Sequence, residues 1–148
     1  MPTYGVSTTN GLLSSEQKAK IASAITHAHS GATGAQAFFA QVMFSSIEAG
    51  AHFMGGVPID TQQIFVHGHI RAGRTEDQRR TLMANVVKAL HEITGLAQRF
   101  IWVYLSELPP VNMIEYGQVL PQPGMEDQWL ASLPQEDREY MLSLRDAL

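Results

Sequence analysis

Apolar and polar positions along the first 60 residues alternate in a way that predicts a strand, a helix and a second strand. Residues 3–6 form a short β-prone run, and residues 14–17 (Ser-Ser-Glu-Gln) have the form of a helix capping box. Ile21 and Ile25 then share one helical face, and residues 38–44 (FFAQVMF) indicate a short, largely buried strand. A β-α-β unit is therefore expected.

The same order of elements recurs in the next 60 residues. Residues 63–70 predict a strand, residues 75–78 (Thr-Glu-Asp-Gln) a second capping box, and residues 101–105 a closing strand. The helix between them ends near Gly95, and its apolar stripe comprises Leu82, Val86, Val87 and Leu90. Equivalent features lie about 60 residues apart, which is typical of an internal duplication.

Two such units predict an α+β fold, with one four-stranded sheet and both helices on the same face. Right-handed crossovers place the helices on one side, so identical subunits are the simplest cover for the other face. We expect a single domain over residues 1–148, with repeat units at about 2–60 and 61–120 and a C-terminal packing arm at 121–148. The arm is rich in Pro and Gly before a short helix around residues 135–144.

Composition narrows the possible functions. The 148 residues are 45% hydrophobic and 16% charged with a net charge of −4, so a globular domain is expected and nucleic acid is not an expected partner. The chain has no cysteine, which excludes disulfides and thiol nucleophiles. It shows no signal-like start and no apolar run of membrane-spanning length, which predicts a soluble cytoplasmic protein without membrane contact.

Pro2 is the first candidate for chemistry. Removal of Met1 would expose its secondary amine, and α-amino groups have a reference pKa near 8. Such an amine can transfer protons at neutral pH. Many chains begin Met-Pro without any consequence, so Pro2 needs supporting residues.

Arg71 and Arg74 lie at the end of a predicted strand, immediately before the Thr75 helix cap. Guanidinium groups bind carboxylates in a bidentate manner, and a helix N-terminus also favours an anion. The alternative is surface ion pairing with Glu76 or Asp77, and the helix start favours the anion site slightly.

Three further candidates come from separate parts of the chain. His29 lies at the end of the first helix, where a capping histidine is the favoured interpretation if this position is considered alone. Tyr104 and Glu115 could converge on one water molecule, although a core tyrosine and a solvated glutamate are the default. His67 and His69 share a strand face, but no carboxylate completes a metal site, so we expect no bound metal.

These residues together resemble the tautomerase superfamily, and within it the subgroup of cis-3-chloroacrylic acid dehalogenase. The similarity runs from Pro2 to about Leu133 and is carried by residues 24–29 (AITHAH), 65–68 (FVHG), 71–74 (RAGR), 101–104 (IWVY) and 115–117 (EYG). The chain departs from that subgroup at Gln118, Ala35 and Phe39.

The resemblance implies a homotrimer of fused β-α-β units and assigns roles to six residues. Pro2 would be the catalytic amine, Tyr104 and Glu115 would direct or deprotonate water, and His29, Arg71 and Arg74 would hold the carboxylate of a small acid. Adding water to cis-3-chloroacrylate would give malonate semialdehyde, with phenylpyruvate tautomerisation as a side activity and no cofactor.

Two alternatives remain open at the level of sequence. The chain could be mainly a keto-enol tautomerase of 2-oxo acids, because a neutral proline amine favours that reaction and a charged one favours water addition. Arg71 and Arg74 would lower the pKa of the amine, whereas a nearby Glu115 would raise it. The superfamily also has cytokine-like members, so a binding protein without physiological catalysis is the other alternative.

Overall fold

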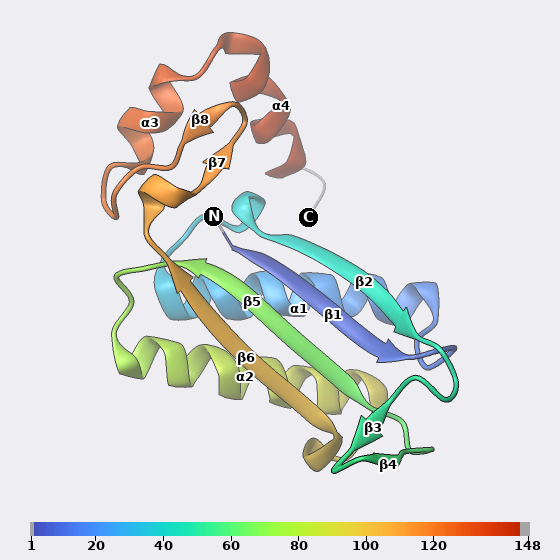
Figure 1. Ribbon diagram of the computed structural model, residues 1–148. Coiled ribbons are helices and arrows are strands. Elements are labelled where there is room, and N and C mark those ends of the chain that lie inside the picture. The colour runs from blue at the N-terminus through green and yellow to red at the C-terminus, as the bar shows by residue number, and fades with distance from the viewer. Residues whose placement is uncertain (1, 146–148) are drawn as a thin grey trace.

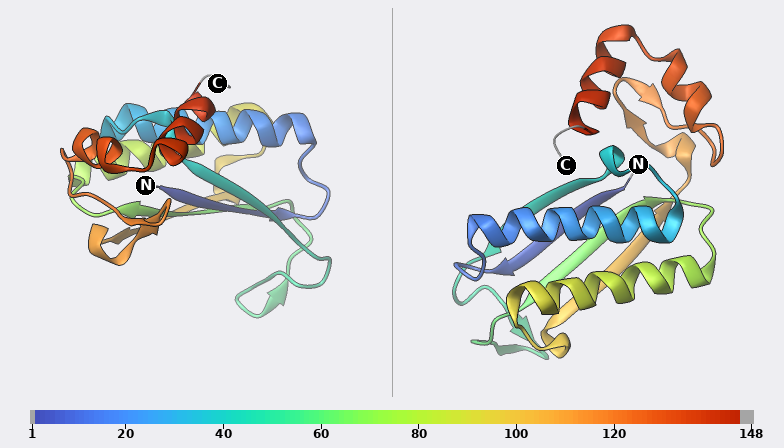
Figure 2. Two further views of the ribbon diagram at one scale, coloured as in Figure 1. Left: turned by 90° about the horizontal axis from the view of Figure 1, so that it is seen from above. Right: turned by 180° about the vertical axis from the view of Figure 1, so that it is seen from behind.

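The computed structural model describes residues 2–145 and confirms the expected α+β architecture, a mixed four-stranded sheet with two long helices on one face (Figures 1 and 2). The strands lie in the order β2-β1-β5-β6. The strands of this sheet are β1 (Thr3–Thr9), β2 (Gln41–Ile47), β5 (Ile64–Arg71) and β6 (Ile101–Leu108), and the two helices are α1 (Ser15–Thr33) and α2 (Glu76–Thr94).

The two β-α-β units meet at the centre of the sheet. β1 pairs with β2 and β5 pairs with β6 in parallel, whereas β1 and β5 are antiparallel. Each unit therefore makes its own crossover, and the two are joined edge to edge. The core lies between the sheet and the helices and includes Tyr4, Val6, Ile21, Ile25, Ile64, Val66, Ile70, Leu82, Val86 and Leu90.

Both helices begin as their sequences predict, but α1 continues to Thr33, four residues beyond the predicted end at His29, because the left-handed residue that ends it is Gly34. The Ser14 and Thr75 side chains accept hydrogen bonds from the backbone N–H groups of Gln17 and Gln78. Each glutamine side chain in turn accepts a hydrogen bond from the backbone N–H of its cap residue. These reciprocal contacts satisfy N–H groups that have no partner within the helix. Both capping boxes are thus confirmed, and α2 ends at a left-handed Gly95 as expected.

The second strand lies further along the chain than predicted. Ala37–Phe39 forms a single 3-10 turn, η1, and the strand runs over Gln41–Ile47 instead of residues 38–44. Phe39 is buried against the C-terminal segment, where its ring meets Trp129 edge to face at 6.3 Å. The prediction of a strand over 38–44 was wrong at its start because Phe39 packs against a segment distant in sequence.

Two small hairpins were not predicted. β3 (Phe53–Met54) and β4 (Val57–Pro58) form one, and β7 (Ile114–Glu115) and β8 (Gln118–Val119) form the other. Each is only two residues long per strand, so neither carries a periodic pattern that a sequence would reveal.

The C-terminal segment forms a cap beside the amino-terminal end of β1 (Figure 1). It contains α3 (Glu126–Ser132), which was not predicted, and α4 (Gln135–Arg145), which was. A second apolar cluster holds it to η1 and comprises Phe39, Leu120, Trp129, Leu133 and Met141. The C-terminal segment therefore lies over the residues that surround Pro2.

Residues 2–145 leave the sheet face opposite the helices uncovered, as the view from above shows (Figure 2). Met43, Trp102 and Tyr104 alternate with the helix-facing residues of their strands and are 51%, 44% and 54% exposed. We call this surface the open face. Among the described residues, no helix combines the length and apolarity that a membrane crossing would need.

Candidate active site

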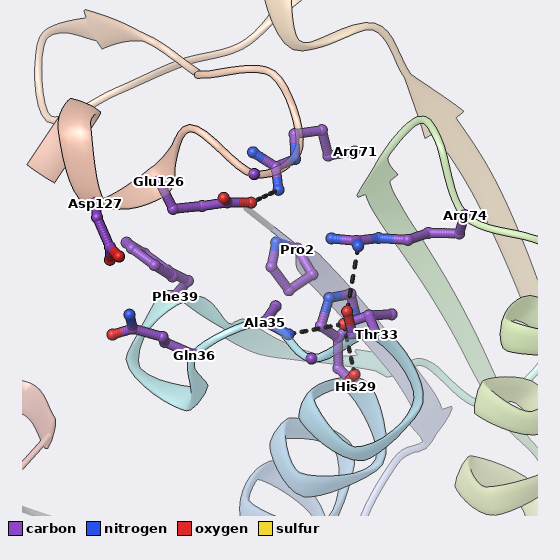
Figure 3. A pocket seen from close by; sticks show the side chains of 12 residues that line it. Pro2, His29, Thr33, Ala35, Gln36, Phe39, Arg71, Arg74, Glu126 and Asp127 are labelled. Atoms are coloured by element: carbon purple, nitrogen blue, oxygen red, sulfur yellow. Dashed lines mark hydrogen bonds and ion pairs between the residues drawn. The ribbon is translucent and has the colours of Figure 1, made fainter.

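A cavity of about 170 Å³ lies at the end of the sheet where β1 begins (Figure 3). It brings together four of the six residues that the sequence singled out, namely Pro2, His29, Arg71 and Arg74. Its other walls come from the loop after α1 and from the start of α3. The remaining lining residues are Thr33, Gly34, Ala35, Gln36, Phe39, Gly124, Glu126 and Asp127.

A glycine turn between the two arginines directs both into the cavity. Arg71 is the last residue of β5, and Gly73 has a φ of 106°, in the region that favours glycine. A Cβ atom on Gly73 would also lie 3.3 Å from Cγ of Pro123 in the C-terminal segment. Side chains three residues apart thus reach one site, with the C-terminal segment packed close to the turn.

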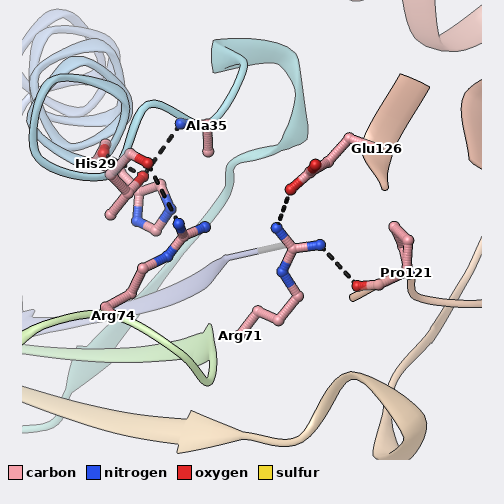
Figure 4. Close-up of polar contacts among 7 residues, drawn as sticks. His29, Ala35, Arg71, Arg74, Pro121 and Glu126 are labelled. Atoms are coloured by element: carbon pink, nitrogen blue, oxygen red, sulfur yellow. Dashed lines mark hydrogen bonds and ion pairs between the residues drawn. The ribbon is translucent and has the colours of Figure 1, made fainter. Parts of the chain in front are cut away.

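Arg71 is buried and engaged by the C-terminal segment (Figure 4). One terminal nitrogen donates to the backbone oxygen of Pro121 at 2.7 Å, and the other forms an ion pair with Glu126. Glu76, which the sequence offered as a surface partner, pairs with Arg80 at 2.7 Å instead. The partner of Arg71 is therefore a carboxylate within the cavity, 55 residues away in sequence.

Arg74 has an unused donor. Its terminal nitrogen donates to the backbone oxygen of Thr33 at 3.2 Å, while its Nε is buried without a hydrogen-bond partner among residues 2–145. Burial, followed by the positive charge of Arg71, lowers the pKa of Arg74, although Glu126 and Glu107 oppose the shift. A buried N–H without a partner is costly, so an acceptor that came within reach of this Nε would stabilise the site.

His29 is held by Tyr4 beneath the cavity. The Tyr4 hydroxyl lies 2.7 Å from Nδ1 of His29, and both side chains are buried. Burial, aided by the charges of Arg74 and Arg71, lowers the pKa of His29 to about 4, so the imidazole is neutral at pH 7. Burial also raises the pKa of Tyr4, which keeps the phenol protonated.

Nδ1 of His29 is the one hydrogen-bond partner of the Tyr4 hydroxyl among residues 2–145, so we assign the phenol as the donor and the imidazole proton to Nε2. A neutral histidine in this tautomer can donate one hydrogen bond to an oxygen of a bound acid. Gly68, which lies opposite Tyr4 in the sheet, makes room for the ring, because a Cβ there would lie 2.5 Å from Cε1 of Tyr4.

The assignment of His29 predicts an NMR result. At pH 7 we expect its nitrogen shifts to report a neutral ring protonated at Nε2, and its titration midpoint near pH 4. Unfolded histidine binds a proton at about pH 6.5, so the contribution of His29 to folding stability falls as the pH drops from about 6.5 to 4. Tyr4→Phe should raise the population of the other tautomer; an Nδ1-protonated wild type would contradict the assignment.

Tyr104 and Glu115 lie outside this cavity in the single chain. Tyr104 is on the open face, where its ring meets Phe65 edge to face at 5.1 Å. It lies opposite His67, which lies opposite Gly5. Tyr104 is thus three residues along and two strands across from Pro2, on the order of 14 Å away at the usual strand spacings.

Glu115 is nearer to Pro2. It is the last residue of β7 and lines a separate hollow with Tyr116 and Tyr140. Thr3 and Phe39 also line that hollow, and Thr3 directly follows Pro2 in the chain. The hollow of Glu115 therefore adjoins the cavity across Phe39, and one chain does not bring Glu115 together with Tyr104.

The histidine pair of β5 has local partners. Nε2 of His67 lies 2.8 Å from the Ser106 hydroxyl, and the rings of His67 and His69 are 4.3 Å apart. Within residues 2–145, no group of three His, Cys, Asp or Glu side chains is placed to hold a metal ion. The expectation that no metal binds here stays a prediction.

Two residues of the site escaped the sequence analysis. Tyr4 belongs to a strand whose alternation marks it as core, and nothing in the sequence links it to His29. Glu126 lies in the Pro- and Gly-rich segment, where no periodic pattern indicates a helix. The one available signal was Gly68, since a glycine within a strand often marks the close approach of a neighbour.

Comparison with known proteins identifies the family of the chain. Residues 1–132 match a family model described as "Putative oxalocrotonate tautomerase enzyme". The crystal structure of a member of the cis-3-chloroacrylic acid dehalogenase family is 35% identical, with a TM-score of 0.90, and the match covers 95% of this chain and 99% of that one. No curated protein sequence matches significantly.

More distant structures share the fold. A protein crystallised after inactivation by 2-oxo-3-pentynoate is 28% identical with a TM-score of 0.73, over 80% of this chain and 94% of that one. An asymmetric trimer of fused 4-OT is 23% identical with a TM-score of 0.73, over 79% and 94% of the two chains. At that identity the trimer supports the fold alone.

Proposed function

Because this chain belongs to the tautomerase superfamily, with the fused β-α-β architecture of its cis-3-chloroacrylic acid dehalogenase-like members, we propose that it adds water to a short unsaturated carboxylic acid without a cofactor. The observation that carries this proposal is the cavity itself, where Pro2 lies among Arg74, Arg71 and His29. Removal of Met1 would place a secondary amine beside a site built for a carboxylate.

The substrate carboxylate is held by Arg74 and His29. The guanidinium group of Arg74 and the Nε2–H of neutral His29 supply the donors, and Arg71 lines the same cavity. Donors on the carboxylate draw electron density from the double bond, which makes its far carbon electrophilic. A fixed orientation also turns the addition into a reaction within one complex.

Water addition to cis-3-chloroacrylate then proceeds in balanced steps. The water oxygen bonds to C3, its proton passes to a carboxylate, and the charged Pro2 amine gives a proton to C2. The resulting 3-chloro-3-hydroxy acid loses chloride and a proton to form malonate semialdehyde. Glu115 is the water-directing carboxylate of this proposal, because its hollow adjoins the cavity.

In this proposal, the Tyr104 side chain that takes part in each active site belongs to a neighbouring copy of the chain. It lies too far from Pro2 in its own chain, yet it is exposed on the open face, which has no cover within one chain. We propose that three copies pack through their open faces and that each supplies Tyr104 to the next. The apolar Met43 and Trp102 support such burial, since one sheet face is normally covered.

Mixing variants tests this exchange. Chains carrying Arg74→Gln or Tyr104→Phe should each be weakly active alone, and particles of three times the chain mass should form in light scattering. Co-expression should restore activity well above either parent, because some mixed trimers contain a site with both residues intact. If mixing restores nothing, Tyr104 acts within its own chain or not at all.

A keto-enol tautomerase is the second candidate function. The family description favours it, and the balance of charge around Pro2 decides between the two reactions. The positive charge of Arg74 favours the neutral amine that ketonisation needs, whereas Glu126 favours the charged amine that water addition needs.

An NMR time course separates these functions. Processed protein lacking Met1 is incubated with cis-3-chloroacrylate and, separately, with phenylenolpyruvate. We expect malonate semialdehyde from the first acid and slower enhancement of ketonisation with the second. Ketonisation alone would make the chain a tautomerase of 2-oxo acids. No reaction with either would contradict both candidate functions for these acids and favour a binding role.

A further inference from the structure

Glu126 places a carboxylate of the protein itself inside a cavity that offers cations to a carboxylic acid. It is the first residue of α3, and Figure 3 shows its side chain reaching from that helix across the cavity to Arg71, above Pro2. Burial would raise the pKa of Glu126, but its hydrogen bonds and the charge of Arg71 outweigh burial and lower it. The carboxylate is therefore ionised at neutral pH.

Existing contacts of Arg71 occupy the two terminal nitrogens that a bidentate contact with a second anion would need. Both of its terminal nitrogens are engaged, one by Glu126 and the other by the backbone oxygen of Pro121 (Figure 4). The Arg71 side chain is only 6% exposed, so an incoming anion cannot approach it from another side without displacing Glu126. A bidentate contact between Arg71 and substrate is blocked while this pair is in place.

Arg74 differs from Arg71 in this respect. No carboxylate lies within ion-pair distance of its guanidinium group among the described residues, and its buried Nε has no hydrogen-bond partner. Of the two guanidinium groups in the cavity, one is neutralised by Glu126 and one is available. Asp127 adds a further negative charge at the wall formed by α3.

We propose that Glu126 is a specificity-determining residue that limits this site to substrates with one carboxylate and excludes dicarboxylates. This inference rests on the proposed function, because it takes the cavity to bind a small carboxylic acid. A monocarboxylate satisfies Arg74 and His29 and leaves an uncharged end near Glu126. The second carboxylate of a dicarboxylate would meet Glu126, and like charges in a partly buried site repel strongly.

Two unreactive acids test the proposal by binding alone. Propionate and succinate differ by one carboxylate on the terminal carbon, and isothermal titration of processed protein gives both Kd values without turnover. Wild type should bind propionate at least about tenfold more tightly than succinate, because one full charge at a few ångströms is worth at least that factor. Equal affinity for the two acids would overturn the proposal.

Variants at the Arg71–Glu126 ion pair test whether Glu126 causes the preference for propionate. Glu126→Gln keeps the shape of the side chain and removes its charge, so the preference for propionate should fall by at least about tenfold. Asp127→Asn is the matched control, with the same charge change in the same wall but no pairing to Arg71, and should shift the preference less than about threefold. An unchanged preference in Glu126→Gln would overturn the role of Glu126.

A double variant keeps the test possible if Glu126→Gln alone does not fold. Arg71→Gln combined with Glu126→Gln removes the buried charge of Arg71 together with that of its partner, which avoids leaving Arg71 unpaired. It should bind propionate through Arg74 with a weaker preference over succinate than wild type, because the repelling carboxylate is absent; a double variant with the full wild-type preference would contradict the proposal. If wild type binds neither acid, the cavity is no carboxylate site and the proposed function fails as well. If wild type binds propionate but the Glu126 variants keep its preference over succinate, only the role of Glu126 is contradicted.

Discussion

Replacement of Pro2 by alanine in processed protein is expected to lower kcat/KM for water addition by about 10²–10⁴, the usual contribution of a positioned acid or base. Alanine leaves a primary amine at the same position, but without the ring that fixes the nitrogen against the cavity wall. Pro2 is buried among Arg74, His29 and Glu126, so a small change in the direction of the N–H bond misplaces the proton. The measurement is steady-state turnover of cis-3-chloroacrylate.

A chain that keeps a residue in front of Pro2 separates the amine from the ring. Inserting Lys between Met1 and Pro2 prevents removal of Met1 and converts the proline nitrogen to an amide, which has no proton to give. This variant should be as inactive as Pro2→Ala or more so, although the proline side chain is intact. Full activity in the blocked chain would rule out the amine as the proton donor.

The fold could be predicted from the sequence because its signals are local. Each capping box spans four residues, and each helix carries an apolar stripe that repeats every three to four positions. The 60-residue period strengthened this prediction, since the order of elements in one β-α-β unit supported the same order in the other. The error at Phe39 has the opposite origin, because its burial depends on Trp129, 90 positions further along the chain.

The site residues also fall into those that local sequence signals predict and those that depend on distant contacts. Pro2, His29, Arg71 and Arg74 stand at the ends of strands and helices, and a correct fold brings such ends together. Glu126 and Tyr4 act through contacts across 55 and 25 positions, which no local pattern encodes. Tyr104 shows a further limit, since its place in the site depends on a surface that one chain leaves uncovered.

Arg74→Gln is expected to have the second largest effect, a fall in kcat/KM of about 10²–10³, because losing a charged donor to a buried carboxylate costs about 3–4 kcal/mol. Arg74 is the one guanidinium of the cavity that is not paired to Glu126, and its Nε has no other hydrogen-bond partner in residues 2–145. Glutamine retains an N–H but removes the positive charge. The loss should appear mainly in KM if Arg74 holds the ground-state carboxylate, and mainly in kcat if it stabilises the charge that develops on addition.

Arg80→Gln provides the matched control for this loss. Arg80 lies in the first turns of α2, six residues from Arg74, and forms an exposed ion pair with Glu76. The same charge is removed from the same region of the chain, but a surface pair of this kind contributes little to stability and does not reach the cavity. Kinetics should therefore be unchanged within about twofold, since long-range screening leaves little of an exposed charge at that distance. Equal losses in both variants would mean that net charge, and not the contact of Arg74 with substrate, controls the rate.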